Sequence, residues 1–108
     1  MKIRIKATRI ELTPQIKEYV QLKMNMLEKY LGKIPVINCD VELSRENGVQ
    51  NSGKIYRTEV NLEVPGQLLR VEKTEKDILK AIDKVKDHLE RAIVKYKEKK
   101  IDKKKKVL

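Results

Sequence analysis

The stretch KIYRTEVNLEVPGQLLRVEK, residues 54–73, contains two runs of alternating apolar and polar residues on either side of a proline–glycine pair. Such alternation is typical of β-strands that bury one face. Pro65 presets φ at the first central position of a tight turn, and Gly66 supplies the positive φ required at the second. The stretch therefore predicts a hairpin of two strands, residues 54–64 and 67–73. Its expected core-facing residues are Tyr56, Thr58, Val60, Leu62, Val64, Leu69 and Val71.

Two segments upstream show the same alternation. VINCDVELSR, residues 36–45, is separated from the hairpin by the polar loop ENGVQNSG, residues 46–53. Cys39 occupies an apolar position of this segment, so we interpret it as a core residue rather than a nucleophile or a metal ligand. In KIRIKA, residues 2–7, the apolar residues alternate with three cations, which makes the open face of this strand basic. The expected core-facing residues are Ile3, Ile5, Ala7, Ile37, Cys39, Val41 and Leu43.

Between these two strands, LTPQIKEYVQLKMNMLEKYLG, residues 12–32, has the start and stop signals of a helix. Thr13 is suited to the N-cap, Pro14 to the first helical position and Gly32 to the left-handed residue that ends a helix. Lys23 falls inside the apolar face. Either its stem packs there with the ammonium at the rim, or it is a cation held in place on an interaction surface. The apolar face comprises Ile16, Tyr19, Val20, Met24, Met26, Leu27, Tyr30 and Leu31.

A second helix is expected after the hairpin, where Thr74 and Asp77 resemble a capping box. The pattern predicts about 26 helical residues. The apolar residues recur every three or four positions, which is also the spacing of a coiled-coil seam, so a dimerising coiled coil is an alternative. Ala81 and Ile93 widen the stripe beyond a two-position seam, which favours packing on the sheet. The stripe itself comprises Ile78, Ile82, Val85, Leu89, Ala92 and Tyr96.

The expected order of elements is strand, helix, three strands, helix. This order predicts an α+β fold in which a four-stranded, mostly antiparallel sheet has its first two strands parallel and both helices on one face. The chain of 108 residues is expected to form one domain over residues 1–100. Residues 101–108 are expected to form a basic, flexible tail.

The net charge of +10 points to an anionic partner. From residue 95 to residue 108 the chain has eight lysines against two acids. Such a field attracts nucleic acid, anionic lipid or acidic proteins in a salt-dependent way. The single cysteine excludes an internal disulfide, and no apolar run has the length of a signal peptide or a membrane span. There is no carboxylate pair, Gly-rich phosphate loop or triad-like set, so we expect neither an enzyme nor a bound cofactor or metal.

The charged residues of the second helix are segregated by sign on a helical wheel. Interspersed signs would serve solubility better, whereas a line of cations on successive turns is suited to a phosphate backbone. We name the two sides the cationic flank and the acidic flank, and we expect the acidic flank to face solvent. The cationic flank comprises Lys80, Lys84, His88, Arg91, Lys95 and Lys99, and the acidic flank comprises Asp83, Asp87 and Glu90.

Two segments, ELTPQIKEYVQLKMNMLEKYL (residues 11–31) and DILKAIDKVKDHLERAIVKYKEK (residues 77–99), together resemble the short ribosome hibernation-promoting factors, relatives of ribosome-associated inhibitor A. The resemblance implies a β-α-β-β-β-α domain similar to double-stranded-RNA-binding domains. It also implies a cytoplasmic bacterial translation inhibitor that occupies the channel for mRNA and for A-site and P-site tRNA on the small ribosomal subunit. Idle ribosomes would thereby be preserved during stress or stationary phase.

The implied partner is the small subunit with its 16S rRNA, bound in competition with mRNA and tRNA by a monomer that needs no membrane. Long members of the family append a second domain that joins two ribosomes; nothing in this sequence corresponds to it, so pairing through such a domain is not expected. A generic RNA-binding module and, less favoured, a dimerising interaction module are the alternatives.

The resemblance carries RNA contacts over by position to Lys23, Lys29, Arg91, Lys95, Lys97 and Lys99. It departs from the family at Leu79, where a tyrosine is common, and at His88, where a lysine is frequent. From the residues and the resemblance together, the predicted RNA-binding set is Lys2, Arg4, Lys6, Lys23, Lys29, Lys80, Lys84, His88, Arg91, Lys95, Lys97 and Lys99.

Overall fold

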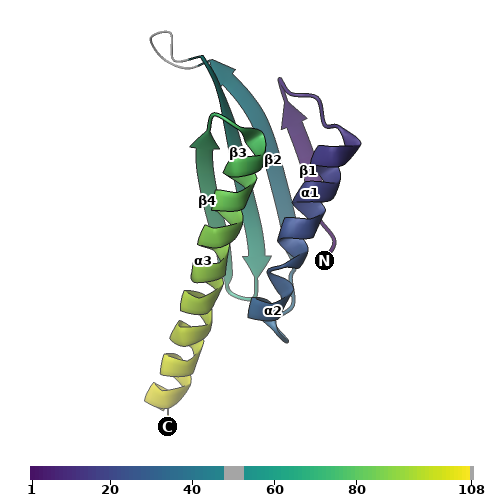
Figure 1. Ribbon diagram of the computed structural model, residues 1–108. Coiled ribbons are helices and arrows are strands. Elements are labelled where there is room, and N and C mark those ends of the chain that lie inside the picture. Colours follow the sequence, from purple (N-terminus) through teal and green to yellow (C-terminus); the bar gives the residue numbers. More distant parts are fainter. Residues whose placement is uncertain (48–52, 108) are drawn as a thin grey trace.

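The computed structural model describes residues 1–47 and 53–107, which form a four-stranded sheet with helices on one face (Figure 1). Its elements are β1 (Arg4–Thr8), α1 (Pro14–Asn25), α2 (Glu28–Leu31), β2 (Asn38–Asn47), β3 (Lys54–Val64), β4 (Gln67–Glu75) and α3 (Ile78–Val107). The strands lie in the order β1-β2-β3-β4, with β1 parallel to β2 and the other neighbours antiparallel. The predicted α+β fold is therefore confirmed, while the likeness to double-stranded-RNA-binding domains stays a prediction.

The Pro65–Gly66 pair makes the predicted turn between β3 and β4. Gly66 has a φ of 79°, a conformation that residues with a side chain rarely adopt. The ladder then pairs core residues of the two strands, such as Val60 with Val71. Of the core-facing residues predicted for this hairpin, Tyr56 is half-buried and the others are buried.

The start of α3 differs from the prediction. β4 continues to Glu75, because Thr74 and Glu75 stay paired with β3. Thr74 therefore does not cap the helix, and the predicted capping box is wrong. Asp77 caps it instead, since its Oδ1 accepts the N–H of Leu79 at 2.8 Å.

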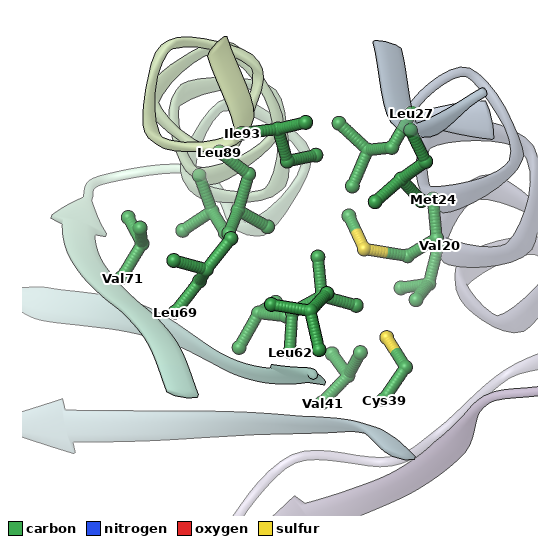
Figure 2. Close-up of a cluster of buried hydrophobic side chains, with 14 of the residues drawn as sticks. Val20, Met24, Leu27, Cys39, Val41, Leu62, Leu69, Val71, Leu89 and Ile93 are labelled. Carbon is green, nitrogen blue, oxygen red and sulfur yellow. The ribbon is translucent and has the colours of Figure 1, made fainter. Parts of the chain in front are cut away.

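The core lies between the sheet and the helices, as Figure 2 shows for a cluster of its side chains. α1 contributes Val20 and Met24, and α3 contributes Leu89 and Ile93, all of which are at most 1% exposed. The apolar stripe of α3 therefore packs on the chain's own sheet. A coiled-coil seam would need the same side chains, so the coiled-coil alternative is wrong for this helix.

The predicted first helix is divided into α1 and α2. Thr13 caps α1 as expected, with its Oγ1 accepting a backbone N–H of the first turn at 3.2 Å. The division lies at Met26 and Leu27, where the N–H of Leu27 donates to the carbonyl of Met24 at 3.0 Å and tightens the turn. Leu27 is consequently buried, whereas Met26, which we expected on the apolar face, is 40% exposed. Gly32 ends α2 with the predicted positive φ, 58°.

The first two strands are shorter at their starts than expected. β1 begins at Arg4, and β2 begins at Asn38. Ile37 therefore lies before the strand and is 54% exposed, so its predicted place in the core is wrong. The backbone N–H of Ile37 still donates a hydrogen bond to the carbonyl of Glu63 at 2.8 Å.

Cys39 is a core residue, as predicted, and is 2% exposed. Burial, with a smaller contribution from the charge of Asp40, raises the pKa of its thiol to about 12. Because the thiolate is the reactive form, we expect a thiol reagent at about pH 8 to leave the native chain unlabelled and to label the urea-unfolded chain fully. Mass spectrometry measures both; rapid labelling of the native chain would contradict the buried position.

α3 extends beyond the sheet at its C-terminal end (Figure 1). The hydroxyl of Tyr96 donates to the carbonyl of Pro65 at 2.5 Å and attaches the helix to the hairpin turn. The helix continues to Val107, past the expected boundary at residue 101, and the division into a domain and a basic tail stays a prediction. Residues 48–52 of the expected polar loop lie outside the described residues. Within the described part of the chain, no helix has both the length and the apolar composition needed to cross a membrane.

Candidate nucleic-acid interface

The rotation of α3 about its axis determines where its charges lie. Because the apolar stripe faces the sheet, the cationic flank lies toward β4 and solvent. In the acidic flank, Asp83 lies toward α1, whereas Asp87 lies on the side of β4. All six side chains of the cationic flank are exposed. Successive turns separate them by about 5.4 Å along the helix axis, so they form a line that an extended phosphate backbone can follow.

A groove of about 600 Å³ lies between the cationic flank and the edge strand β4. Lys84 reaches across it, with Nζ 2.9 Å from Oε2 of Glu75, and this hydrogen bond lowers the pKa of Glu75. Lys73 also lines the groove, and the predicted set omits it. The sequence signal was present, since Lys73 follows Leu69 and Val71 at the next alternate position and so lies on the helix-covered face. The lining residues are Glu72, Lys73, Thr74, Lys84, Asp87 and Arg91.

Lys23 joins α1 to α3. Its Nζ lies 3.2 Å from Oδ1 of Asp83 and 5.2 Å from the ring centroid of Tyr19. The Tyr19 hydroxyl donates to the same carboxylate at 2.6 Å. The hydrogen bonds to Asp83 raise the pKa of both Lys23 and Tyr19, so both groups stay protonated at neutral pH. The geometry matches the packed-stem interpretation of Lys23, and its contact with RNA stays a prediction.

The other two acids of the acidic flank, Asp87 and Glu90, are compensated within the helix. Lys86, whose side chain is 14% exposed, lies 2.8 Å from Asp87 and 2.9 Å from Glu90, and these contacts raise its pKa. The acidic flank faces solvent, as expected, at Asp87 and Asp83, whose side chains are 56% and 41% exposed, but not at Glu90, which is 20% exposed. All three of its carboxylates form ion pairs. Among the described side chains of the cationic flank, by contrast, only Lys84 has an ion-pair partner. The helix consequently presents uncompensated positive charge on one side.

The predicted cations of the first strand lie on the opposite face of the sheet. Arg4 and Lys6 alternate with the inward residues of β1, and Lys2 precedes the strand; all three are exposed. Arg4 is compensated by Asp40, with Nε 2.7 Å from Oδ1. On the same face, Arg57 contacts the carboxylates of Glu42, Glu59 and Glu72. Because the sheet separates its two faces, the structure does not bring these cations together with the cationic flank, and their contact with RNA stays a prediction.

Lys29 and Lys97 lie near Tyr30 at the end of α2. The Nζ of Lys97 donates to the carbonyl of Tyr30 at 2.9 Å, which ties α2 to α3. Lys29 is exposed, and its Nζ lies 5.2 Å from the ring centroid of Tyr30. Tyr30 in turn lines a depression together with Arg91 and Lys95 of the cationic flank. Lys29 thus extends the positive surface from α3 onto α2, whereas Lys97 is engaged in positioning Tyr30.

His88 is surrounded by cations from two elements. Partial desolvation by its neighbours lowers its pKa below the ordinary value of 6.5, and the charges of Lys73 on β4 and of Arg91 and Lys95 on α3 lower it further. The ring is therefore neutral at physiological pH in the free protein. A bound phosphate would offset this repulsion and raise the pKa of His88, so RNA binding would be coupled to proton uptake.

We therefore expect the affinity for RNA to increase as the pH falls from about 7.5 to about 6, because the bound state holds the His88 proton more tightly than the free state. Replacing His88 with alanine should remove this part of the pH dependence. Replacing it with lysine, which stays charged throughout, should remove the dependence while keeping the affinity high. Fluorescence anisotropy with a labelled RNA at constant ionic strength measures all three chains; the same pH dependence in the alanine variant would exclude a contact by His88.

Comparison with known proteins shows which family the chain belongs to. The chain matches the family model described as Sigma 54 modulation protein / S30EA ribosomal protein over residues 3–101. It is 38% identical over 88 residues to a ribosome hibernation promotion factor of Deinococcus radiodurans, covering 82% of this chain and 44% of that protein. It is 29% identical over 99 residues to a ribosome hibernation promoting factor of Pseudomonas putida, covering 92% of this chain and 89% of that protein.

The fold is similar to that of a solved domain. The N-terminal domain of Protein Y from Thermus thermophilus superposes with a TM-score of 0.75 and 29% identity, covering 89% of this chain and 99% of that domain. The chain spans about half the length of several curated relatives that it matches. Because the family model covers every strand and helix of the fold through most of α3, the chain belongs to the Sigma 54 modulation protein / S30EA ribosomal protein family.

Proposed function

We propose that this protein binds the small ribosomal subunit in the cytoplasm through the cationic flank of α3 and occupies the channel for mRNA and for A-site and P-site tRNA. Occupancy would inhibit translation and preserve idle ribosomes during stress or stationary phase, with no covalent chemistry and no cofactor. The names of the relatives support this partner, and the chain aligns with 89% of the length of the Pseudomonas putida factor. A monomer suffices, since the apolar stripe of α3 is covered by the chain's own sheet.

The observation that carries the proposal is the unequal compensation of charge. The carboxylates of the acidic flank are held by Lys23 and Lys86, and the arginines of the open sheet face are held by acids on neighbouring strands. Apart from Lys84, which pairs with Glu75, the described side chains of the cationic flank have no ion-pair partner and lie on one exposed line. Neutralising RNA phosphates with such a line releases counterions and supplies affinity, while the shape of the binding site would supply selectivity for the ribosome.

Co-sedimentation with purified small subunits tests the proposal. We expect the protein to pellet with the subunits, and saturating initiator tRNA should displace it. Undiminished binding in the presence of the tRNA would contradict occupancy of the channel. A naked RNA duplex serves as the comparison ligand, because equal affinity for the duplex and for the subunit would favour the generic RNA-binding module instead.

A further inference from the structure

A depression of about 350 Å³ lies between the end of α2 and the outer side of α3. We call it the α2–α3 notch. Its size is at the small end of ligand sites, which typically span ~300–1,000 Å³. It overlaps the cationic flank and shares only Arg91 with the groove beside β4. The residues that line it are Tyr30, Glu90, Arg91, Val94, Lys95 and Glu98.

The notch is lined by two apolar side chains, Tyr30, which also packs against the edge of the core, and Val94. Val94 lies on the side of α3 away from the sheet and is 39% exposed. Tyr30 is half-buried, and its backbone is held by the hydrogen bond from Lys97. An aromatic ring and a branched aliphatic side chain together offer a surface against which a planar ring can pack.

The charges around the notch are arranged asymmetrically. Arg91 and Lys95 are exposed on the side that belongs to the cationic flank, and the ammonium of Lys29 lies by the Tyr30 ring. Glu98 is exposed at the rim, and the carboxylate of Glu90 is held by Lys86 at 2.9 Å. A polyanion would therefore place its phosphates toward Arg91 and Lys95 and keep its uncharged part toward Tyr30 and Val94.

We propose that the α2–α3 notch binds the base of one unpaired RNA nucleotide, which packs against Tyr30 and Val94 while the flanking phosphates contact Arg91 and Lys95. This inference rests on the RNA-binding function proposed above and adds a subsite to it. A paired base has its faces covered by its neighbours in the stack, whereas an unpaired base can be turned outward onto an aromatic side chain. The notch would make the protein prefer RNA with a bulge or loop over a continuous duplex.

Two hairpin RNAs test the proposal: one carries a single bulged 2-aminopurine, and the other is fully paired with the same sequence otherwise. We expect the protein to bind the bulged hairpin about five- to tenfold more tightly, the lower part of the range for stacking on one aromatic residue. Binding should also quench the 2-aminopurine fluorescence. Tyr30→Ala should abolish the preference and the quenching, and Tyr30→Phe should retain both.

A second pair of variants changes only exposed residues, so that a loss of binding is not expected to come from unfolding of the chain. Val94→Glu changes an exposed residue in the notch, and Leu22→Glu makes the same change at an exposed residue of α1 that is 54% exposed and does not line the notch. Both add one negative charge. We expect Val94→Glu to remove the preference for the bulged RNA and Leu22→Glu to preserve it.

Absence of a preference for the bulged RNA, or its persistence in Val94→Glu, would overturn the notch proposal. Equal weakening of both RNAs by Tyr30→Ala would also overturn it, because Tyr30 would then act only by positioning its lysine neighbours. These outcomes are distinct from failure of the proposed function, which would appear as loss of co-sedimentation with small subunits by the unsubstituted chain. Unchanged 2-aminopurine fluorescence on binding would overturn the notch proposal as well, because the bulged base would then not pack against Tyr30.

Discussion

Replacing Lys84, Arg91 and Lys95 together with alanine is expected to weaken binding to the small ribosomal subunit about 100-fold, at about 1 kcal/mol for each lost phosphate contact. The slope of log affinity against log salt concentration should fall by about 3. All three side chains are exposed, and none contributes to the core. Their loss should therefore leave the thermal unfolding midpoint nearly unchanged. Filter binding or co-sedimentation over a salt series measures the effect.

The matched control removes the same amount of positive charge from the opposite face, through alanine at Lys2, Arg4 and Lys6. These side chains can act on RNA bound at α3 only through the long-range field, which is screened beyond ~10 Å at moderate salt. We expect a loss of less than about tenfold, which reflects net charge alone. Equal losses in the two triple variants would contradict the assignment of the interface to the cationic flank. They would mean that the open face of the sheet also contacts the RNA.

Leu89→Ala is expected to have the largest effect on stability, a loss of about 3 kcal/mol in the free energy of unfolding. Leu89 is fully buried where α3 packs on the sheet, so the shorter side chain would leave a cavity. Domains of this kind have total stabilities of only ~5–15 kcal/mol. Urea denaturation followed by circular dichroism should show a lower midpoint with an unchanged slope.

Leu79→Ala is the control, since Leu79 lies on the same helix and is 39% exposed. Its loss should be below about 1 kcal/mol. A similar cost at the two positions would mean that α3 is rotated away from the sheet, as a coiled-coil dimer would require. Sedimentation equilibrium provides an independent measurement, and we expect the mass of one chain, 12.7 kDa. Leu89→Lys is unsuitable for this purpose, because it would place a charge in the core and unfold the chain.

Much of the fold could be predicted from local patterns. The alternation in residues 54–73 predicted both strands of the hairpin, and Pro65–Gly66 predicted its turn. The errors lie at element ends, where two local signals compete. Thr74 is a good N-cap residue, yet pairing with β3 keeps it in β4 and leaves the cap to Asp77. Ile37 continues the alternation of β2, yet the strand begins one residue later.

Prediction of the candidate site was less complete. The wheel of α3 grouped the six members of the cationic flank correctly, because residues on one helix keep a fixed angular relation. It did not include Lys73, whose proximity to His88 depends on how β4 and α3 pack together. It also did not indicate that Lys23 would be paired with Asp83, or that Tyr30 and Val94 would share a depression.

Within each element, periodicity alone determined which residues share a face, because the backbone repeats every two residues in a strand and every 3.6 in a helix. Tertiary structure decided which charges are compensated. Tyr19 and Asp83 are 64 positions apart, and Tyr30 and Lys97 are 67 apart, so no local period relates them. Packing of α1 and α2 beside α3 brings these groups into contact and pairs Asp83 with Lys23, whereas Lys86 of α3 itself pairs with Asp87 and Glu90. The cationic flank keeps its charge because α3 turns it toward solvent at the edge of the sheet.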